Sequence, residues 1–248
     1  HKGSFGDVSV IGGAPSMSGA AALAAIAALH GGAGRVFVGV MDASARHAIT
    51  AAYPPLMVRA PEDLDLQTST VVCGCGGGDD IHTLLPNVLS SSPQLVLDAD
   101  ALNALACDTS LQTLLKKRST RNKSTVLTPH PLEAARLLNC TTQDVQHNRL
   151  HAAQQLADRF QSVVVLKGSG SIMTSPNRTP IINGSGNALL ATAGTGDVLA
   201  GLIGAYIARH EDAFEATCQA VFAHGKVADD WSSTGPALDA ALLAASVR

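Results

Sequence analysis

The segment Gly194-Thr195-Gly196-Asp197 contains residues suited to phosphoryl transfer. The apolar residues that follow predict a helix that begins here. Backbone N–H groups at the start of a helix have no acceptor within it, so a bound anion can accept their hydrogen bonds. Asp197 would lie beside that anion and could remove a proton from a hydroxyl that attacks a phosphoryl group. Alternatively, Asp197 is a first-turn residue favoured only by the helix dipole.

A second candidate phosphate-binding segment is Lys167-Gly168-Ser169-Gly170-Ser171, which follows an apolar run. Glycines and hydroxyls suit a backbone that wraps a nucleotide, and the Lys167 ammonium can neutralise phosphate charge. The same residues can also form a β-hairpin turn, which this segment favours when it is considered alone. The sequence contains no Gly-Lys-Ser/Thr, and therefore no Walker A loop. It also lacks a G-x-G-x-x-G fingerprint in the context that a Rossmann fold requires.

His130 lies between Pro129 and Pro131, which restrict the backbone and hold the imidazole at a defined place. A functional histidine and a structural one both agree with this pattern. Glu133, three residues further on, could be a ligand or a first-turn carboxylate of a helix.

Two carboxylates follow another apolar run in Asp98-Ala99-Asp100, with Asn103 close behind. They could face a metal or a polar substrate, or Asp100 could cap a helix that starts near Ala101. The glycine-rich segment 74–78 indicates either a tight turn that needs positive φ or a close approach of a ligand.

Each of these segments comes directly after a predicted strand. The expected strands are residues 8–11, 35–40, 71–73, 95–97, 125–127 and 163–166, with a late pair at 172–173 and 181–182. The expected helices include residues 18–30, with Ser18 as N-cap, and 197–209, 213–232 and 238–247. Strands without polar alternation, separated by helices, predict a mostly parallel sheet with helices on both faces, a three-layer α/β fold. Because ligands bind beyond the carboxyl ends of parallel strands, the polar segments should converge on one edge.

Composition narrows the class of protein. The chain has 248 residues, of which 46% are hydrophobic and 15% charged, and this excludes a disordered chain. A net charge of −3 argues against a protein that coats nucleic acid. Five cysteines without a C-x-x-C pair indicate reduced thiols, with no zinc knuckle or disulfide framework, as in a cytoplasmic protein. The longest apolar stretch is too short to span a bilayer, so no membrane partner is expected.

Taken together, the motifs resemble those of the ADP/ATP-dependent NAD(P)H-hydrate dehydratases of the ribokinase-like superfamily. The resemblance covers residues 1–248 and implies one ribokinase-like domain. Its motifs, in chain order, are HKGSFG at 1–6, IGG at 11–13, SGA at 18–20, the glycines at 74–78, DADALN at 98–103, TPHPLE at 128–133, LKG at 166–168, GN at 186–187 and GTGD at 194–197.

The resemblance implies a repair reaction in which ADP or ATP activates the hydroxyl of hydrated NADH or NADPH, so that it leaves and NAD(P)H is restored. Asp197 would be the catalytic base. The residues implied to contact the hydrated dinucleotide are Ala20, Gly78, His130 and Asp197. Those implied to hold the nucleotide are Lys167, Gly168, Ser169, Gly170, Ser171 and Gly196, and an anion hole would consist of the N–H groups of Gly194, Thr195 and Gly196.

The same resemblance implies Mg²⁺ as a partner, although its ligands cannot be assigned from the sequence. It also implies a homotetramer and an NAD(P)HX epimerase domain or partner. The chain departs from the family pattern at four positions. Cys75 stands where Pro is common, Gly77 where Leu is common, Leu132 where Gly is common and Ser171 where Thr is common.

Two other functions agree with parts of the sequence. A kinase for a small alcohol or vitamin precursor would use the same fold and the same base. A non-catalytic adenine-nucleotide sensor would need the glycine-rich segments alone, but it has no use for a carboxylate beside a phosphate. The intact Gly194-Thr195-Gly196-Asp197 therefore favours an enzyme.

Overall fold

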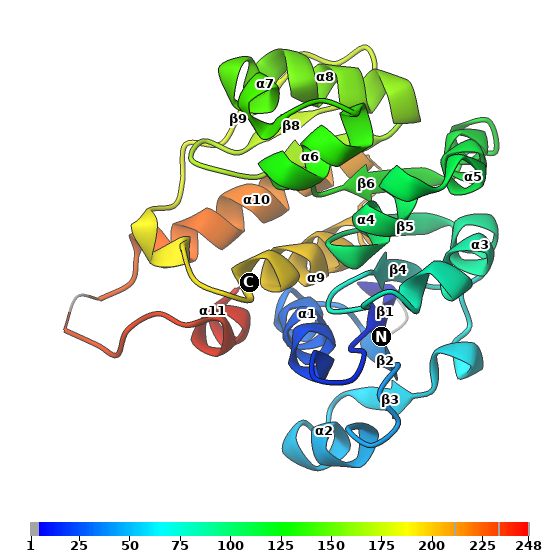
Figure 1. Ribbon diagram of the computed structural model, residues 1–248. Helices are drawn as coiled ribbons and strands as arrows, with labels where there is room; N and C mark the ends of the chain where they lie inside the picture. The colour runs from blue at the N-terminus through cyan, green and yellow to red at the C-terminus, as the bar shows by residue number, and fades with distance from the viewer. Residues whose placement is uncertain (1–4, 211, 233, 248) are drawn as a thin grey trace.

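The computed structural model describes residues 5–210, 212–232 and 234–247. Within these ranges, one sheet has the strand order β3-β2-β1-β4-β5-β6-β7-β8-β9 (Figure 1). Neighbouring strands from β3 to β7 are parallel, whereas β8 and β9 pair antiparallel, which confirms the predicted mostly parallel sheet. The strands are β1 Asp7–Gly12, β2 Arg35–Val40, β3 Met57–Arg59, β4 Thr70–Cys73, β5 Gln94–Leu97, β6 Ser124–Leu127, β7 Val163–Leu166, β8 Ile172–Thr174 and β9 Ile181–Ile182.

Helices cover both faces of the sheet, and a separate apolar core lies beneath each helical layer (Figure 1). Successive strand side chains point to opposite faces, so in β5 Val96 joins one core while Leu95 and Leu97 join the other. The first layer contains α1 Ser18–His30, α9 Thr195–Ile207, α10 Ala213–Asp229 and α11 Ala240–Ser246. The second contains α3 Ile81–Ser91, α4 Asp100–Cys107, α5 Thr109–Ser119, α6 Pro131–Leu138, α7 Thr142–His147 and α8 Arg149–Phe160, and the short α2 Arg46–Ala52 lies beside β3. The predicted three-layer α/β fold is confirmed.

Helix ends differ from the prediction where local capping decides them. Helix α1 begins at Ser18, so its N-cap is Met17 rather than Ser18. Helix α9 begins at Thr195 because Gly194 takes a left-handed N-cap conformation with φ 90°. Helix α11 begins only at Ala240, where the carboxylate of Asp239 accepts a hydrogen bond from the N–H of Leu242. No helix within the described ranges is both long and apolar enough to cross a bilayer.

The chain order reverses its direction across the sheet between β1 and β4, and the loops after these strands lie side by side. The N–H of Gly13 donates to the Cys75 carbonyl (3.0 Å), and that of Ala14 donates to the Gly76 carbonyl (2.7 Å). A crevice beyond the carboxyl ends of strands at such a point is the usual ligand site of an open parallel sheet. Residues 1–4 of the first recognised motif lie outside the described residues.

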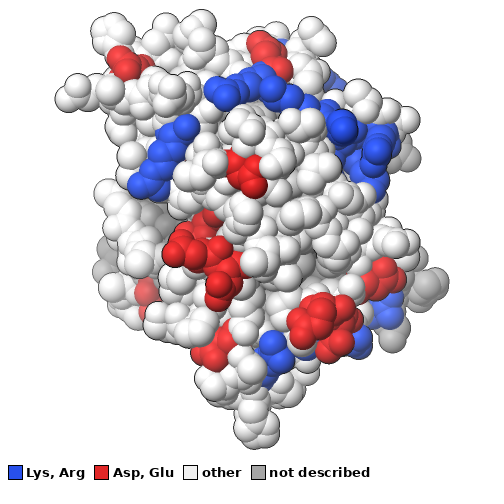
Figure 2. Space-filling view, turned by 45° about the vertical axis from the view of Figure 1, so that its right-hand side comes forward, with Lys and Arg blue, Asp and Glu red and all other residues white. Residues whose placement is uncertain are grey.

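On the face shown in Figure 2, Lys and Arg form a band across the upper part, while the larger Asp and Glu clusters lie in the middle and lower parts; acidic patches also occur at the upper edge and basic ones in the lower part. Helix α5 ends with Lys116, Lys117 and Arg118, where positive charge complements the helix dipole. Arg118 is almost fully buried, and its guanidinium donates to the carbonyls of Leu89, Ser92 and Ser124. Arg118 therefore has a structural role near the end of α5, whereas Lys116 and Lys117 are exposed.

Close packing of α1 against α9 depends on Gly201, since a Cβ there would lie 1.9 Å from the carbonyl oxygen of Ala24. Gly201→Ala is expected to lower the free energy of unfolding by about 1–3 kcal/mol or more, because the two helices must separate. Gly19→Ala is the matched control, since Gly19 of α1 has open space around it and alanine favours helix by up to about 1 kcal/mol. Urea unfolding of both variants measures the difference, and equal stabilities would contradict this packing.

Candidate active site

A cavity of about 660 Å³ opens at the carboxyl edge of the sheet. Its walls come from the loop after β7, the first turn of α9, the segment after β9 and the middle of α10. The sequence-predicted residues that line it are His130, Lys167, Gly168, Ser169, Gly170, Ser171, Thr195 and Gly196. The structure therefore brings residues 167–171, here called the lysine loop, and the start of α9 together around one cavity. The loop is also a β-hairpin between β7 and β8, so both interpretations of residues 167–171 agree with the structure.

Thr195 and Gly196, in the first turn of α9, line the cavity, whereas Gly194 and Asp197 do not. The Thr195 hydroxyl donates to the carbonyls of Leu190 and Thr192, which ties the helix start to the preceding segment. The N–H groups of this turn have no acceptor within the helix and can bind an anion. The Cα of Gly194 packs against α1 and α11, because a Cβ there would lie 2.7 Å from Leu23 Cδ1 and 2.9 Å from Ala240 Cβ.

Asp197 projects from this first turn toward two other polar side chains. One carboxylate oxygen of Asp197, one of Asp98 and the Cys75 sulfur all lie within 4.8 Å of one another. Burial, and then the negative charge of Asp98, raise the pKa of Asp197 to about 6, while a hydrogen bond from the Cys75 thiol opposes the shift. Burial and the same two carboxylates raise the pKa of Cys75 well above its ordinary value, so the thiol stays protonated. Asp197 is thus a base whose pKa lies just below neutrality.

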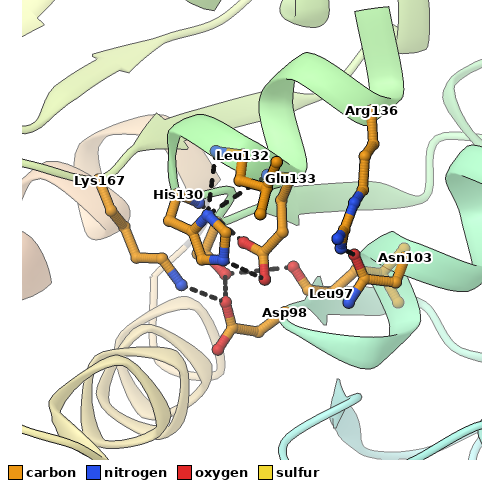
Figure 3. A network of polar contacts seen from close by, with 9 residues as sticks. Leu97, Asp98, Asn103, His130, Leu132, Glu133, Arg136 and Lys167 are labelled. Atoms are coloured by element: carbon orange, nitrogen blue, oxygen red, sulfur yellow. Dashed lines mark hydrogen bonds and ion pairs between the residues drawn. The ribbon is translucent and has the colours of Figure 1, made fainter. Parts of the chain in front are cut away.

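Lys167 supplies the positive charge of the site (Figure 3). Its ammonium donates to Asp98 Oδ1 (2.6 Å), which also accepts from the Thr128 hydroxyl (2.7 Å). Burial alone would lower the pKa of Lys167, but the charges of Asp98 and Glu133 outweigh it and raise that pKa. A Cβ on Gly196 would lie 3.4 Å from Lys167 Nζ. The ammonium therefore remains charged directly beside the first turn of α9.

His130 and Glu133 form the N-terminal capping box of α6. His130 Nδ1 accepts from the N–H of Leu132 (3.1 Å) and of Glu133 (3.3 Å), and Glu133 Oε2 accepts from the N–H of His130 (2.8 Å). Since Nδ1 is an acceptor, the neutral imidazole carries its proton on Nε2, which lies 3.3 Å from Glu133 Oε1 (Figure 3). The Leu132 side chain is exposed, so its place in α6 does not disturb this arrangement.

The electrostatics of this pair favour a neutral imidazole. Burial, and then the charge of Lys167, lower the pKa of His130. Burial raises the pKa of Glu133 to about 7, although the charge of Lys167 opposes that shift. Glu133 is thus a first-turn carboxylate that caps α6, as one of the two sequence-based interpretations predicted. His130 keeps about 45% of its side chain exposed, so it is available to a ligand.

The Asp98-Ala99-Asp100 segment turns through a strained residue. Ala99 has φ 48° and ψ −115°, a conformation that costs a residue with a side chain about 1–3 kcal/mol. On either side of this turn, Asp98 accepts a hydrogen bond from Lys167, and Asp100 Oδ2 accepts one from the N–H of Gly78 in the glycine-rich loop (2.9 Å). Capping of a helix by Asp100 was a wrong alternative, because α4 begins at Asp100 itself and Ala99 is its N-cap.

The glycine-rich loop joins the two sides of the site. Gly74, Gly76 and Gly78 all have positive φ, so the tight-turn interpretation is confirmed for them. A Cβ on Gly74 would lie 2.0 Å from the Asp98 carbonyl oxygen, and one on Gly76 would lie 2.9 Å from the Ala20 Cβ. Ala20 and Gly78 do not line the 660 Å³ cavity. They lie on the side of the site formed by the segments after β1 and β4. Cys75, in the same glycine-rich loop as Gly78, brings its sulfur within 4.8 Å of an Asp197 carboxylate oxygen.

Two residues near the cavity, His224 and Arg149, belong to none of the sequence motifs. His224 lines the cavity from α10, and its Nε2 donates to the Thr195 carbonyl (3.0 Å). The guanidinium of Arg149 donates hydrogen bonds to backbone carbonyls of the loop after β7. Neither stands in a glycine-rich or proline-flanked segment, so the local sequence carries no signal for them.

This fold and this site define a ribokinase-like protein. The ribokinase-like superfamily protein of Enterococcus faecalis superposes with a TM-score of 0.82 at 25% identity, over 98% of this chain and 86% of that one. Within this class, the model of the NAD(P)H-hydrate dehydratase family matches residues 8–247, and the chain belongs to that family.

Similar proteins include the ADP-dependent (S)-NAD(P)H-hydrate dehydratase of Neisseria meningitidis serogroup B, with 41% identity over 92% of this chain and 78% of that protein. The ADP/ATP-dependent NAD(P)H-hydrate dehydratase of Bacillus subtilis, co-crystallized with ATP/Mg²⁺, superposes with a TM-score of 0.85 at 29% identity, over 98% of this chain and 88% of that one. The chain spans less than half the length of the bifunctional NAD(P)H-hydrate repair enzymes of Coxiella burnetii (48%) and Escherichia coli (44%).

Proposed function

We propose that this protein restores NADH and NADPH from their hydrated forms and uses ADP or ATP to turn the ring hydroxyl into a phosphate leaving group. The observation that carries the proposal is the placement of the Asp197 carboxylate on the same helix turn as the anion-binding N–H groups and beside Lys167. A base next to a phosphate site suits the activation of an alcohol by phosphoryl transfer. The names of the relatives at 41% and 29% identity support the same substrate.

In this mechanism Asp197 takes the proton of the substrate hydroxyl, whose oxygen attacks the terminal phosphorus of the nucleotide. The N–H groups of Gly194, Thr195 and Gly196 and the Lys167 ammonium stabilise the transferring phosphoryl group. The nucleotide leaves one phosphate shorter. The lone pair of the ring nitrogen then expels phosphate with the former hydroxyl oxygen, and loss of a proton from the neighbouring ring carbon restores the double bond.

The donor set is compatible with Mg²⁺. Magnesium usually binds one or two carboxylates together with substrate phosphates, and it prefers oxygen to sulfur. Asp98 offers such a carboxylate. Its hydrogen bonds from Thr128 and Lys167 both use Oδ1, so Oδ2 could coordinate the metal ion. The Cys75 sulfur is a poor ligand for Mg²⁺, because this hard cation prefers oxygen. Asp98 would therefore hold the ion together with the nucleotide, and the ion would neutralise phosphate charge.

The two substrates would approach Asp197 from different sides. The cavity walls formed by Lys167, Gly168, Ser169, Gly170, Ser171 and Gly196 suit the nucleotide. Ala20, Gly78 and His130 would contact the hydrated dinucleotide, with the proton on His130 Nε2 as a hydrogen-bond donor.

We also propose that residues 1–248 form one domain and that the protein is a cytoplasmic homotetramer working with an epimerase domain or partner. The exposed side chains of Ile182 and Phe222 offer apolar surface for such an assembly.

Incubation with chemically hydrated NADH, in the presence of ADP or ATP, tests this function. The expected result is recovery of NADH absorbance with release of one phosphate per NADH, and no recovery without nucleotide. A stable phosphorylated product would instead indicate a kinase. Nucleotide binding without any turnover of the hydrate would indicate a sensor.

The pKa of Asp197 sets the expected pH dependence. A raised carboxylate pKa of about 6 leaves the base ionised at neutral pH and protonated in acid, so kcat/KM should fall as pH drops through 6 and lose about tenfold per unit below it. Initial rates between pH 5 and 8 measure this limb. Glu133→Gln is the control, since it removes the other carboxyl that titrates near neutrality, and the limb near pH 6 should persist in it. A rate that stays constant down to pH 5 would contradict the assignment.

A further inference from the structure

Arg149, the first residue of α8, binds the loop after β7 from the side opposite the cavity. Its Nη1 donates to the Ser169 carbonyl (2.5 Å), and its Nη2 donates to the carbonyls of Leu166 (3.2 Å) and Lys167 (3.3 Å). Arg149 does not line the cavity, whereas Lys167 and Ser169 do. The guanidinium thus draws three carbonyl oxygens away from the space that phosphates would occupy.

Gly168 lies against the same guanidinium. Its φ is 146°, and a Cβ at this position would lie 2.8 Å from Arg149 Nη2. The path of the loop therefore needs a glycine at position 168. It also needs a planar side chain with several N–H donors, here Arg149, packed against that glycine. Among the side chains of the protein, only arginine offers five N–H donors in one rigid fork.

Among the residues that the structure describes, the charge of Arg149 has no anionic partner. No carboxylate lies within 4.0 Å of it among the described residues, and its buried Nε has no hydrogen-bond partner there. A buried polar group without a protein partner is costly unless a water or a ligand satisfies it. The phosphates of a nucleotide bound above the loop would supply the missing negative charge.

We propose that Arg149 is a positioning residue for the nucleotide. It fixes residues 166–169 so that the N–H and hydroxyl groups of the loop face the phosphates, and it adds positive potential beneath them. The inference rests on the proposed function in one respect, namely that the ligand of this loop is ADP or ATP.

Calorimetric titration of ADP into Arg149→Met and Arg149→Lys tests this role. Arg149→Met is expected to raise the Kd for ADP at least ~10-fold, because it loses three hydrogen bonds from a charged donor. Arg149→Lys keeps the charge but cannot span three carbonyls, so an increase between about 3-fold and that of Arg149→Met is expected. The KM for the hydrated dinucleotide at saturating nucleotide should stay within about threefold of the wild type, because its proposed contacts at Ala20, Gly78 and His130 lie outside the loop that Arg149 holds.

Arg159→Met is the matched control on the same helix. Arg159 Nη2 donates to Gln112 Oε1 (3.3 Å), away from the loop, so the Kd for ADP should not change. A purely structural role of Arg149 would lower the melting temperature and the fraction of binding-competent protein but leave Kd unaltered. An ADP affinity of Arg149→Met within twofold of the wild type would overturn the proposal, and if that variant does not fold, the same result for Arg149→Lys would do so. Absence of ADP and ATP binding to the wild-type protein would refute the proposed function instead.

Discussion

Replacement of Asp197 by Asn is expected to lower kcat at least ~100-fold while the Kd for ADP stays within about threefold. Asparagine keeps the size of the side chain and its place in the first turn of α9, but it cannot accept the hydroxyl proton. The nucleotide is expected to bind through the N–H groups of that turn and the lysine loop, which the substitution leaves in place. Initial rates with hydrated NADH, together with calorimetric ADP binding, separate the two quantities.

Asp79→Asn serves as the control for this variant. Asp79 is exposed in the loop between β4 and α3, so the loss of its charge should leave kcat within about twofold. Undiminished turnover by Asp197→Asn would remove Asp197 from the mechanism. An equal loss in both variants would point to net charge rather than to a positioned base.

Substitution of Lys167 by Met is the second change with a large expected effect. The loss removes the cation that pairs with Asp98 at 2.6 Å and lies beside Gly196, so the transferring phosphoryl group loses a stabilising charge. A decrease of kcat/KM for the nucleotide of at least ~100-fold is expected. Without the ammonium, the pKa values of Asp197 and Glu133 should rise further, because its charge opposes both shifts. The acidic limb of the pH profile should therefore move to higher pH.

Rate measurements over pH 5–9 on Lys167→Met test both expectations, after circular dichroism has shown that the variant is folded. Lys226→Met is the comparison variant, since Lys226 of α10 forms an exposed ion pair with Asp230, the residue after that helix, and its loss should have little effect. If the acidic limb of Lys167→Met coincided with that of the wild type, the charge coupling between Lys167 and Asp197 would be disproved.

Much of the arrangement around the site could be predicted from the sequence, because buried parallel strands appear as short apolar runs. Residues 71–73 and 95–97 illustrate this: each is fully buried, and each is followed by polar or glycine residues. The convergence of these segments follows from the common direction of the strands. The edge strand β3 was missed because it is only three residues long, with Met57 and Val58 half-buried and a charged, exposed Arg59 at its end.

Features that depend on long-range packing could not be predicted. The contact between Cys75 and Asp197 requires β1 and β4 to lie side by side, and the loop after β4 to turn through glycines with positive φ. The left-handed backbone of Ala99 is imposed by its surroundings, since alanine has no local preference for it. Likewise, Arg149 looks like an ordinary helix residue until α8 is placed beneath the loop after β7.

The most direct measurement follows the oxygen of the substrate hydroxyl. Hydrated NADH labelled with ¹⁸O at that position is converted with unlabelled ADP, and the phosphate released is analysed by mass spectrometry. Phosphoryl activation requires the label to appear in inorganic phosphate, because the C–O bond breaks after the oxygen has bonded to phosphorus. Recovery of the label in water, with unlabelled phosphate, would show that the hydroxyl departs without phosphorylation and would contradict the role assigned to Asp197.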